Sequence, residues 1–229
     1  LKYLIDKCHE NGIAVIMDIV LNQADYENPY VKMYWDGAKP TATSPFFNPT
    51  ATHPYSVFFD FNHESPHTQW LVDAVCQYWL TEYKMDGFRF DLSKGFTQIN
   101  SGTNVDLWGK YDASRIKIWK RIYDKIRAYD ANAYVILEHF ADNSEETVLA
   151  NYGMMLWGNS TYNFRQGAQG YLPGSNIAFG IHKQRGWNDA HLISYTESHD
   201  EERLMYDVLT YGNSSPQGYK TYVLNTALR

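Results

Sequence analysis

The sequence predicts an α/β fold built on a parallel sheet, of the (β/α) barrel type. Helix-like and strand-like segments alternate along the chain, with long loops after the strands. Polar side chains gather directly after each strand, where barrel enzymes keep their active sites. No glycine-rich phosphate loop follows any strand, which counts against a doubly wound sheet. The strands are too few to close an eight-stranded barrel, so we expect a partial barrel.

The first segments predict a helix, a strand and a long irregular stretch. Residues 1–11 place apolar side chains at helical spacing, and Gly12 ends the helix. The apolar run 13–20 predicts a parallel strand buried on both faces. Asp18 stands inside this run, and a carboxylate there needs a partner. Residues 23–64 lack periodicity and carry several prolines, so we expect a functional loop or a small subdomain.

Two further helices alternate with the next strands. Ser65 followed by proline predicts a helix start. This helix runs to Lys84 with an apolar stripe formed by Trp70, Leu71, Ala74, Val75, Tyr78 and Trp79. The strand 87–91 follows. A helix with isoleucines four residues apart then starts at Ser114, and the strand 134–137 comes after it.

The last part of the chain repeats the alternation with weaker signals. We expect a short helix over 144–150 and strands over 153–157 and 191–196. The region between these two strands is rich in glycine and reads as irregular. Ser215-Pro216 predicts the start of a final helix.

The amino-acid composition argues against some classes of binding partner. The net charge is −6 without a cluster of lysine and arginine, which argues against nucleic acid. No apolar run approaches the ~20 residues that a membrane span requires. The aromatic share is 16%, with 19 Tyr and 7 Trp, and sugar rings stack on such side chains. Core packing is the alternative use of these rings. Cys8 and Cys76 lie on apolar helical faces and read as small buried hydrophobes.

Charged side chains stand at the ends of successive predicted strands. They are Asp18 with Asn22, Arg89 with Asp91, Glu138, and His199 with Asp200. Such a set suits hydrolysis of a glycosidic bond, in which one carboxylate attacks and a second, kept protonated, donates to the leaving oxygen. Arg89 is two residues from Asp91, so both point to one side of the strand and Asp91 stays ionised. The apolar run before Glu138 suits a protonated acid. Ligation of a hard cation is the alternative.

Five segments resemble, in order and on the expected strands, conserved regions of the α-amylase family of glycoside hydrolases (glycoside hydrolase family thirteen). They are Asp18–Asn22, Asp60–Pro66, Gly87–Lys94, Glu138 after an apolar run, and His199-Asp200. The resemblance covers essentially the whole chain. It implies that residues 1–229 are a fragment of a catalytic (β/α)8 TIM barrel, covering about strands 3 to 7, with 23–64 as a domain-B-like insertion after strand 3.

The resemblance also implies a mechanism. Asp91 would be the nucleophile, Glu138 the general acid/base and Asp200 the stabiliser of the transition state. The enzyme would be a retaining, α-amylase-like hydrolase that acts on starch, glycogen or maltooligosaccharides through a covalent glycosyl-enzyme intermediate. Asp18 would support Arg89 from below the site.

Further site residues are implied as substrate contacts. Arg89 would orient the nucleophile and His199 would hydrogen-bond sugar hydroxyls. Lys94 would contact the leaving-group side of the substrate. Tyr26 and Trp108 lie in loops where a ring could stack on a glucose unit, and packing is the alternative for each.

The chain departs from the family pattern at three positions. Gln23, Gly95 and Ser198 stand where the family usually has His, His and Asn. Gln23 and Ser198 can still hydrogen-bond sugar, so substrate preference changes more than chemistry. A calcium site is possible, because the family commonly uses the residue at Asn22 and the backbone carbonyl at Gly95. Its carboxylate ligand stays open among Asp25, Glu27 and Asp36.

Several alternatives remain at this point. An α-glucosidase, a branching enzyme or a transglycosylase of the same family would carry the same residues. Alternatives of another class are a non-catalytic glucan-binding barrel and a metal-dependent barrel hydrolase. Members that degrade polymers are usually exported, which favours a secreted, periplasmic or cell-surface location. The sequence itself assigns neither compartment nor oligomeric state.

Overall fold

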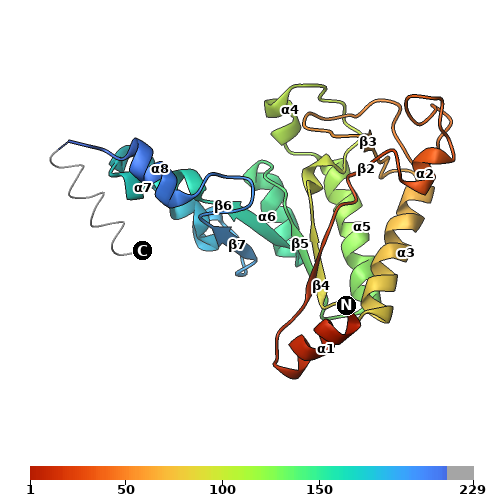
Figure 1. Ribbon diagram of the computed structural model, residues 1–229, viewed down its shortest axis with the longest axis horizontal. Coiled ribbons are helices and arrows are strands. Elements are labelled where there is room, and N and C mark those ends of the chain that lie inside the picture. Colours follow the sequence, from red (N-terminus) through yellow and green to blue (C-terminus); the bar gives the residue numbers. More distant parts are fainter. Residues whose placement is uncertain (216–229) are drawn as a thin grey trace. The chain divides into compact units, whose positions relative to one another are not determined.

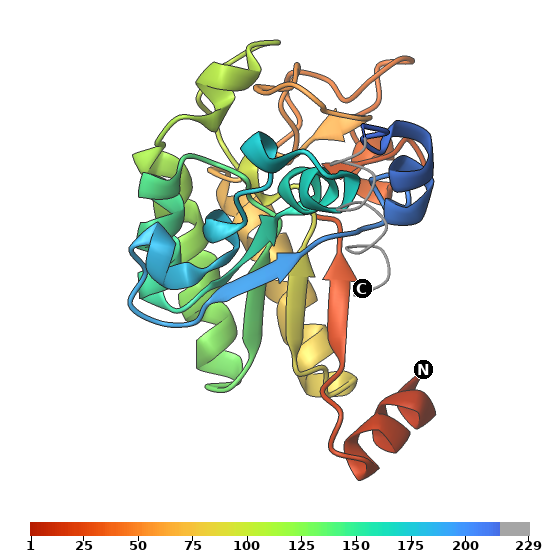
Figure 2. The same ribbon diagram turned by 90° about the vertical axis from the view of Figure 1, so that its left-hand side faces the viewer.

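A parallel sheet organises the chain, as predicted. The computed structural model describes residues 1–215. Its five-stranded sheet has the order β1-β4-β5-β6-β7, and within the described residues it is open. The strands are β1 (Ile16–Ile19), β4 (Gly87–Phe90), β5 (Tyr134–Leu137), β6 (Met155–Asn159) and β7 (Leu192–Tyr195). The β1–β4, β4–β5 and β5–β6 pairs are all parallel (Figure 2).

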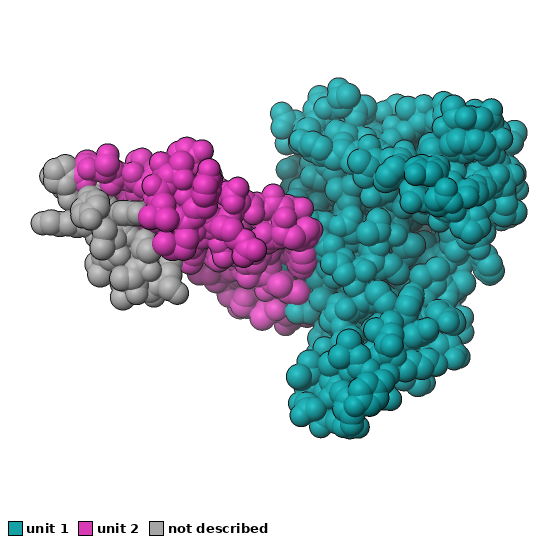
Figure 3. All heavy atoms as spheres, in the orientation of Figure 1, with its two compact units in different colours: residues 1–156 teal, residues 157–229 magenta. Residues whose placement is uncertain are grey.

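The chain divides into two compact units, which are described separately below. The first unit comprises residues 1–156 and the second begins at Trp157 (Figure 3). The boundary lies inside β6.

Helices of the first unit alternate with its strands. They are α1 (Lys2–Glu10), α3 (Pro66–Glu82), α5 (Ala113–Tyr129) and α6 (Asn143–Tyr152). Helix α5 packs against both α3 and α6 (Figure 1). Its predicted apolar face is confirmed, because Ile118, Ile122 and Ile126 are buried. These contacts cover one face of the sheet and hold β4 and β5 in place.

Side-chain caps start the two long helices. The Ser65 hydroxyl accepts a hydrogen bond from the His67 amide, and Pro66 takes the first position of α3. The Asp112 carboxylate caps α5 by accepting from the amides of Ser114 and Arg115. The predicted start of α3 is therefore confirmed, and α5 begins one residue before its predicted start.

The buried stripe of α3 differs from the predicted one. The residues that pack inward are Thr68, Val72, Cys76 and Leu80, whereas Trp70 and Tyr78 are exposed. Helix α3 carries apolar side chains around most of its circumference, so periodicity alone does not say which row of residues four apart faces the core. The contact with α5 decides it. Cys76 is buried, as predicted, and Cys8 is partly buried.

Strand β4 is the buried centre of the first unit, and β1 lies at the sheet edge. Every residue of β4 is buried, as expected for an inner parallel strand. Gly87 is required in β4 because a Cβ atom there would lie 2.3 Å from the Tyr134 carbonyl oxygen. The prediction that 13–20 is buried on both faces is wrong. Within residues 1–215, β1 pairs with β4 alone, and its Asp18 side chain is 62% exposed.

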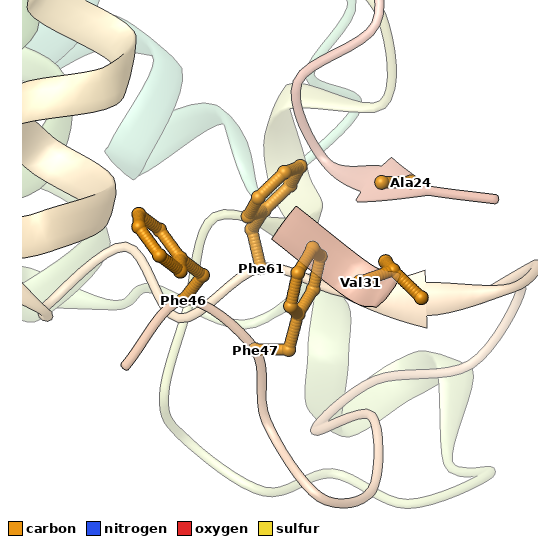
Figure 4. Close-up of a cluster of buried hydrophobic side chains, with 5 residues drawn as sticks. All are labelled: Ala24, Val31, Phe46, Phe47 and Phe61. Carbon is orange, nitrogen blue, oxygen red and sulfur yellow. The ribbon is translucent and has the colours of Figure 1, made fainter. Parts of the chain in front are cut away.

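Residues 23–64 form a small subdomain with a core of its own. The segment contains β2 (Gln23–Ala24), α2 (Pro29–Lys32) and β3 (Phe59–Asp60), and β2 pairs antiparallel with β3. Its buried apolar side chains are Ala24, Val31, Phe46, Phe47 and Phe61 (Figure 4). Figures 1 and 2 place it beyond the carboxyl ends of β1 and β4. Residues 23–64 are therefore folded. Their helix and strands are too short to show the hydrophobic periodicity from which such elements are predicted.

Several short elements were not predicted. In the first unit these are η1 (Ser93–Gly95) and α4 (Val105–Gly109). In the second unit they are α7 (Thr161–Gln169), η2 (Leu172–Gly174), η3 (Ala178–Gly180), η4 (His182–Arg185) and α8 (Leu204–Tyr211). Helices α7 and α8 pack together. The helix predicted from Ser215-Pro216 lies outside the described residues.

Candidate active site

A single guanidinium group lies among three carboxylates at the carboxyl ends of β1, β4 and β5. Arg89 Nη1 is 2.7 Å from Asp18 Oδ1 and 2.9 Å from Asp91 Oδ1. Arg89 Nη2 is 2.9 Å from Glu138 Oε2. The structure therefore brings together four of the predicted site residues, Asp18, Arg89, Asp91 and Glu138.

The register of the sheet produces this cluster. Asp18 and Arg89 are directly opposite each other on the parallel strands β1 and β4. Asp91 follows Arg89 by two residues and so lies on the same side of the chain. Glu138 is the first residue after β5, and its amide continues the ladder by donating to the Phe90 carbonyl at 3.1 Å. Parallel strands end at one edge of a sheet, so charges at their ends converge.

The three carboxylates raise the pKa of the Arg89 guanidinium. Burial works to lower the pKa of its guanidinium, and the contacts with Asp18, Glu138 and Asp91 outweigh burial and raise the pKa. Arg89 is therefore a permanent cation at the centre of the cluster. Its Nη1 atom lies against Asp91 Oδ1, so the Arg89–Asp91 pair is present in the structure.

The surroundings of Glu138 differ from the predicted apolar setting. Its side chain is only 11% exposed, but it lies against a guanidinium and a peptide amide. The Leu92 amide donates to Glu138 Oε2 at 3.0 Å. Two donors therefore face the carboxyl group of Glu138. The apolar run before Glu138 points into the sheet core and does not line the carboxyl group, which is why the sequence pattern misled.

Backbone amides in the turn after β4 donate hydrogen bonds to Glu138. Leu92 has the left-handed backbone angle φ 44°, and Phe140, two residues after Glu138, has φ 53°. Such angles are strained for side-chain-bearing residues and concentrate at functional sites. The left-handed turn at Leu92 presents its amide to the Glu138 carboxylate. The sequence carries no glycine there to signal the turn.

His199 and Asp200 lie in the second unit, after β7. Both side chains are well exposed, and His199 Nε2 is 3.4 Å from Asp200 Oδ1. The Asp200 amide donates to Ser198 Oγ at 3.1 Å. The described contacts of these two residues are with their own unit. Their roles beside Asp91 and Glu138 therefore remain predictions.

Lys94 and Trp108 are buried against each other, which does not support the predicted contacts with substrate. Trp108 is 4% exposed; His53 stacks on its ring at 5.2 Å and Lys94 Nζ lies 4.0 Å from the ring centroid. Lys94 Nζ also donates to the Phe140 carbonyl at 2.9 Å. Burial lowers the pKa of Lys94 to about 8. The packing alternative holds for Trp108 in this structure.

Tyr26 and Gln23 lie in the 23–64 subdomain. Tyr26 is 57% exposed and contacts Phe58 edge to face, so its ring is accessible to a ligand. Gln23 is partly buried in β2, where its side-chain oxygen accepts a hydrogen bond from Asn22 Nδ2 at 2.8 Å. The Tyr26 ring is therefore exposed, whereas the Gln23 side chain is engaged with its neighbour.

Buried polar atoms gather around Asn22, the predicted calcium ligand. Asn22 Oδ1 is buried and has no hydrogen-bond partner among the described residues. His53 Nε2 lies 3.3 Å from Asp60 Oδ1. A Cβ atom at Gly95 would be 1.9 Å from Asn22 Oδ1 and 2.8 Å from His53 Nε2. His53 and Asn22 thus fill the space that a side chain at position 95 would need, which explains the glycine there.

The carboxylate nearest this cluster is Asp60, which was not among the three left open. Asp25 accepts from the Glu27 amide, Glu27 pairs with Lys32, and Asp36 caps its own turn. Residues 1–215 contain no group of three or more His, Cys, Asp or Glu side chains arranged as a metal site. They also contain no helix long and apolar enough to cross a membrane.

A buried charged network lies behind Glu138, and two of its members, Arg115 and Glu145, were not predicted from the sequence. Glu145, in the first turn of α6, accepts from Arg115 Nε at 2.6 Å and Nη2 at 2.8 Å. His139 Nε2 lies 2.7 Å from the same carboxylate, and His139 Nδ1 lies 2.9 Å from Ser93 Oγ. Burial lowers the pKa of His139. In the sequence, this network is visible only as polar residues at the end of a strand and in the first turn of a helix, which is a weak basis for predicting it.

Comparison with curated proteins places these observations in a family. Alpha-amylase 3 of Dictyoglomus thermophilum is 26% identical over 153 residues, covering 59% of this chain and 28% of that protein. A cyclomaltodextrinase of Thermoanaerobacter pseudethanolicus is 32% identical over 115 residues (40% and 18%). The 1,4-alpha-glucan-branching enzyme 2-2 of Arabidopsis thaliana is 32% identical over 114 residues (48% and 14%). These homologues are glycoside hydrolases and transglycosylases of the α-amylase family, which supports the resemblance seen in the sequence.

The chain spans between 14% and 28% of the length of these three relatives. No protein-family model matches it.

Solved structures show the same fold. An α-amylase from Geobacillus thermoleovorans matches 93% of the chain and 46% of its own length, with a TM-score of 0.67 at 17% identity. A pullulanase from Anoxybacillus matches 92% of the chain and 31% of its own length, with a TM-score of 0.65 at 18% identity. These likenesses confirm the prediction that the sheet is of the barrel type.

Proposed function

We propose that this chain takes part in the retaining hydrolysis of α-glucans by an α-amylase-like enzyme. The observation that supports this most is the shared guanidinium of Arg89, which contacts both Asp91 and Glu138. A retaining glycosidase needs two carboxyl groups near each other, about 5–5.5 Å apart, flanking the scissile bond. Asp91 and Glu138 both contact the Arg89 side chain at the carboxyl edge of the parallel sheet, so they are near each other, as such an enzyme needs.

The geometry suggests how the two carboxylates divide the work. Asp91 attacks the anomeric carbon while Glu138 gives a proton to the departing glycosidic oxygen, leaving a covalent glycosyl-enzyme. Glu138 then takes a proton from the water that releases the sugar. The acid step requires that Glu138 hold a proton when the substrate binds.

The other predicted residues complete this proposal. Asp200 would stabilise the positive charge that develops on the sugar, and His199 would hydrogen-bond its hydroxyls. The exposed Tyr26 ring would stack on a glucose unit. The subdomain 23–64, which lies beyond the carboxyl ends of β1 and β4, would act as a domain-B-like wall of the substrate cleft.

Transfer of a glucan chain is the second candidate reaction, because branching enzymes are among the relatives. Hydrolysis and transfer share the glycosyl-enzyme and differ in whether water or a sugar hydroxyl attacks it. The test incubates the full-length protein with maltoheptaose and with starch. Proton NMR reads the anomer of the first product, and debranching followed by chain-length analysis detects new branches. A first-formed β-anomer would indicate inversion and contradict the proposal.

Calcium is a proposal that rests on the atoms around Asn22. His53 Nδ1 lies 2.8 Å from the Pro54 carbonyl oxygen, which can only accept, so Nδ1 is the donor. Asn22 Oδ1, Asp60 Oδ1 and His53 Nε2 are buried and have no hydrogen-bond partner among the described residues. The two oxygens are the ligand type that calcium prefers and would hold it. Calcium there would tie the subdomain to the end of β1.

Metal analysis of the purified protein and its melting temperature with and without EGTA test this proposal. We expect bound calcium and a lower melting temperature after chelation. Metal-free protein with an unchanged melting temperature would contradict the calcium proposal.

A further inference from the structure

The main chain of Glu138 is held by the turn that follows β4. The Glu138 carbonyl accepts from the Ser93 amide at 3.0 Å and from Ser93 Oγ at 2.7 Å. The Glu138 carboxylate accepts from the Leu92 amide. Backbone and side chain of Glu138 are therefore both attached to the two residues that follow Asp91. The position of the proposed acid is set relative to the proposed nucleophile by this turn.

Ser93 Oγ is itself held from the other side. It is completely buried and lies 2.9 Å from His139 Nδ1. The hydroxyl carries a single proton, so it donates either to the Glu138 carbonyl or to His139 Nδ1, and the Ser93 amide holds the carbonyl in both cases. The buried hydroxyl therefore joins the main chain of Glu138 to the ring of the next residue.

The position of His139 depends on a buried ion pair. Its Nε2 atom faces Glu145 Oε1 at 2.7 Å, and Glu145 also binds Arg115 through two nitrogens and accepts from the Asp112 amide. Burial raises the pKa of Glu145, but the contacts with His139 and Arg115 outweigh it and lower the pKa to about 2. Glu145 is thus an ionised acceptor, and Nε2 of His139 must be the donor.

We propose that Ser93, His139 and Glu145 are positioning residues that orient Glu138 for proton transfer to the leaving oxygen. The proposal rests on the proposed function, because it assigns these residues to the acid step of that reaction. None of the three needs to contact substrate. Their effect is to prevent rotation of Glu138 away from the nucleophile, and small displacements of a catalytic group slow reactions strongly.

The first test uses Ser93→Ala in the full-length protein and two substrates. One is a maltooligosaccharide, whose leaving group needs a proton. The other is the 2,4-dinitrophenyl α-maltooligoside, whose leaving group departs without one. We expect kcat/KM on the maltooligosaccharide to fall about 10- to 100-fold, with the value on the activated substrate within about twofold of wild type. Equal losses on both substrates would overturn the proposal.

The matched control is Ser114→Ala, which removes a hydroxyl from the same network. Ser114 Oγ donates to Asp112 Oδ1 at 2.6 Å and, among the described residues, forms no hydrogen bond with Glu138 or His139. We expect this variant to keep the wild-type ratio of the two kcat/KM values. A changed ratio in Ser114→Ala would show that general damage to the network, and not orientation of Glu138, sets the rate.

A second pair of variants keeps the test valid if Ser93→Ala does not fold. His139→Asn retains a polar group that can reach Ser93, whereas His139→Phe removes every polar contact. We expect the selective loss on the maltooligosaccharide to be smaller for Asn than for Phe. Equal losses would overturn the positioning role. If the wild-type protein turns over neither substrate, the proposed function itself fails, which is a distinct outcome.

Discussion

Arg89 and Glu138 lie on neighbouring parallel strands, and Arg89 Nη2 is 2.9 Å from Glu138 Oε2 while Nη1 is 2.9 Å from Asp91 Oδ1. The planar guanidinium thus contacts the two carboxylates through two different nitrogens, which sets the distance between them. A lysine ammonium is a point charge and cannot reproduce this fork. The identity of the cation, and not only its charge, therefore matters for the geometry of the site.

Arg89→Lys is expected to lower kcat/KM on maltooligosaccharides by about 100-fold, because one ammonium cannot hold both carboxylates in place. The measurement is steady-state kinetics, with circular dichroism to confirm folding. Arg127→Lys is the control, because Arg127 contacts the Ala133 carbonyl on the same unit, away from the cluster. Near-wild-type kinetics in Arg89→Lys would show that charge alone suffices.

Asp91→Asn is expected to reduce turnover by at least about 1,000-fold while the fold is kept, because an amide cannot form the glycosyl-enzyme. Mass spectrometry after incubation with a fluorinated, slow-reacting maltosyl substrate should detect a covalent adduct in wild type and none in the variant. Substantial turnover by Asp91→Asn would remove Asp91 from the role of nucleophile.

Gly95→Ala is expected to destabilise the protein by about 1–3 kcal/mol, because the new methyl group would overlap Asn22 and His53 in a packed interior. Its Cβ atom would lie 1.9 Å from Asn22 Oδ1. Gly109→Ala is the matched control, since a Cβ atom there meets nothing within 4 Å. Urea unfolding compares the two. Equal stability of both variants would show that Asn22 and His53 move aside without cost.

His63 should make the protein sensitive to mild acid. Burial lowers the pKa of His63 to about 3, although its contact with the Leu21 carbonyl acts to raise it. The folded state then stays unprotonated between the ordinary histidine pKa and about 3, while the unfolded state takes up a proton. Stability is therefore lost as the pH falls through this window.

The expected size follows from this linkage. Wild type should lose about 2 kcal/mol more stability than His63→Gln between pH 7 and pH 5. Urea unfolding at the two pH values measures the difference, with His67→Gln as a control at an exposed histidine. Parallel stability curves for wild type and His63→Gln would show that His63 protonates in the folded state.

Local patterns allowed much of the site to be predicted. Arg89 and Asp91 are two residues apart in a strand, which places them on one side whatever the rest of the fold does. Glu138 directly follows a short apolar strand, so its position at the sheet edge follows from the direction of the chain. The helix start at Ser65-Pro66 and the isoleucine row of α5 likewise depend on nearby residues only.

Other features could not be predicted because they depend on contacts between distant segments. Helix α3 buries Val72 and Cys76 instead of Trp70 because α5 packs on that side. Trp108 is enclosed by His53 and Lys94, which come from two other segments. The sequence by itself determined the parallel sheet and the charges at its edge. Only the tertiary structure decided that Arg89 is shared by Asp91 and Glu138 and that Ser93 and His139 support Glu138. Side-chain burial and pairing depend on neighbours far along the chain, and residue spacing carries no record of them.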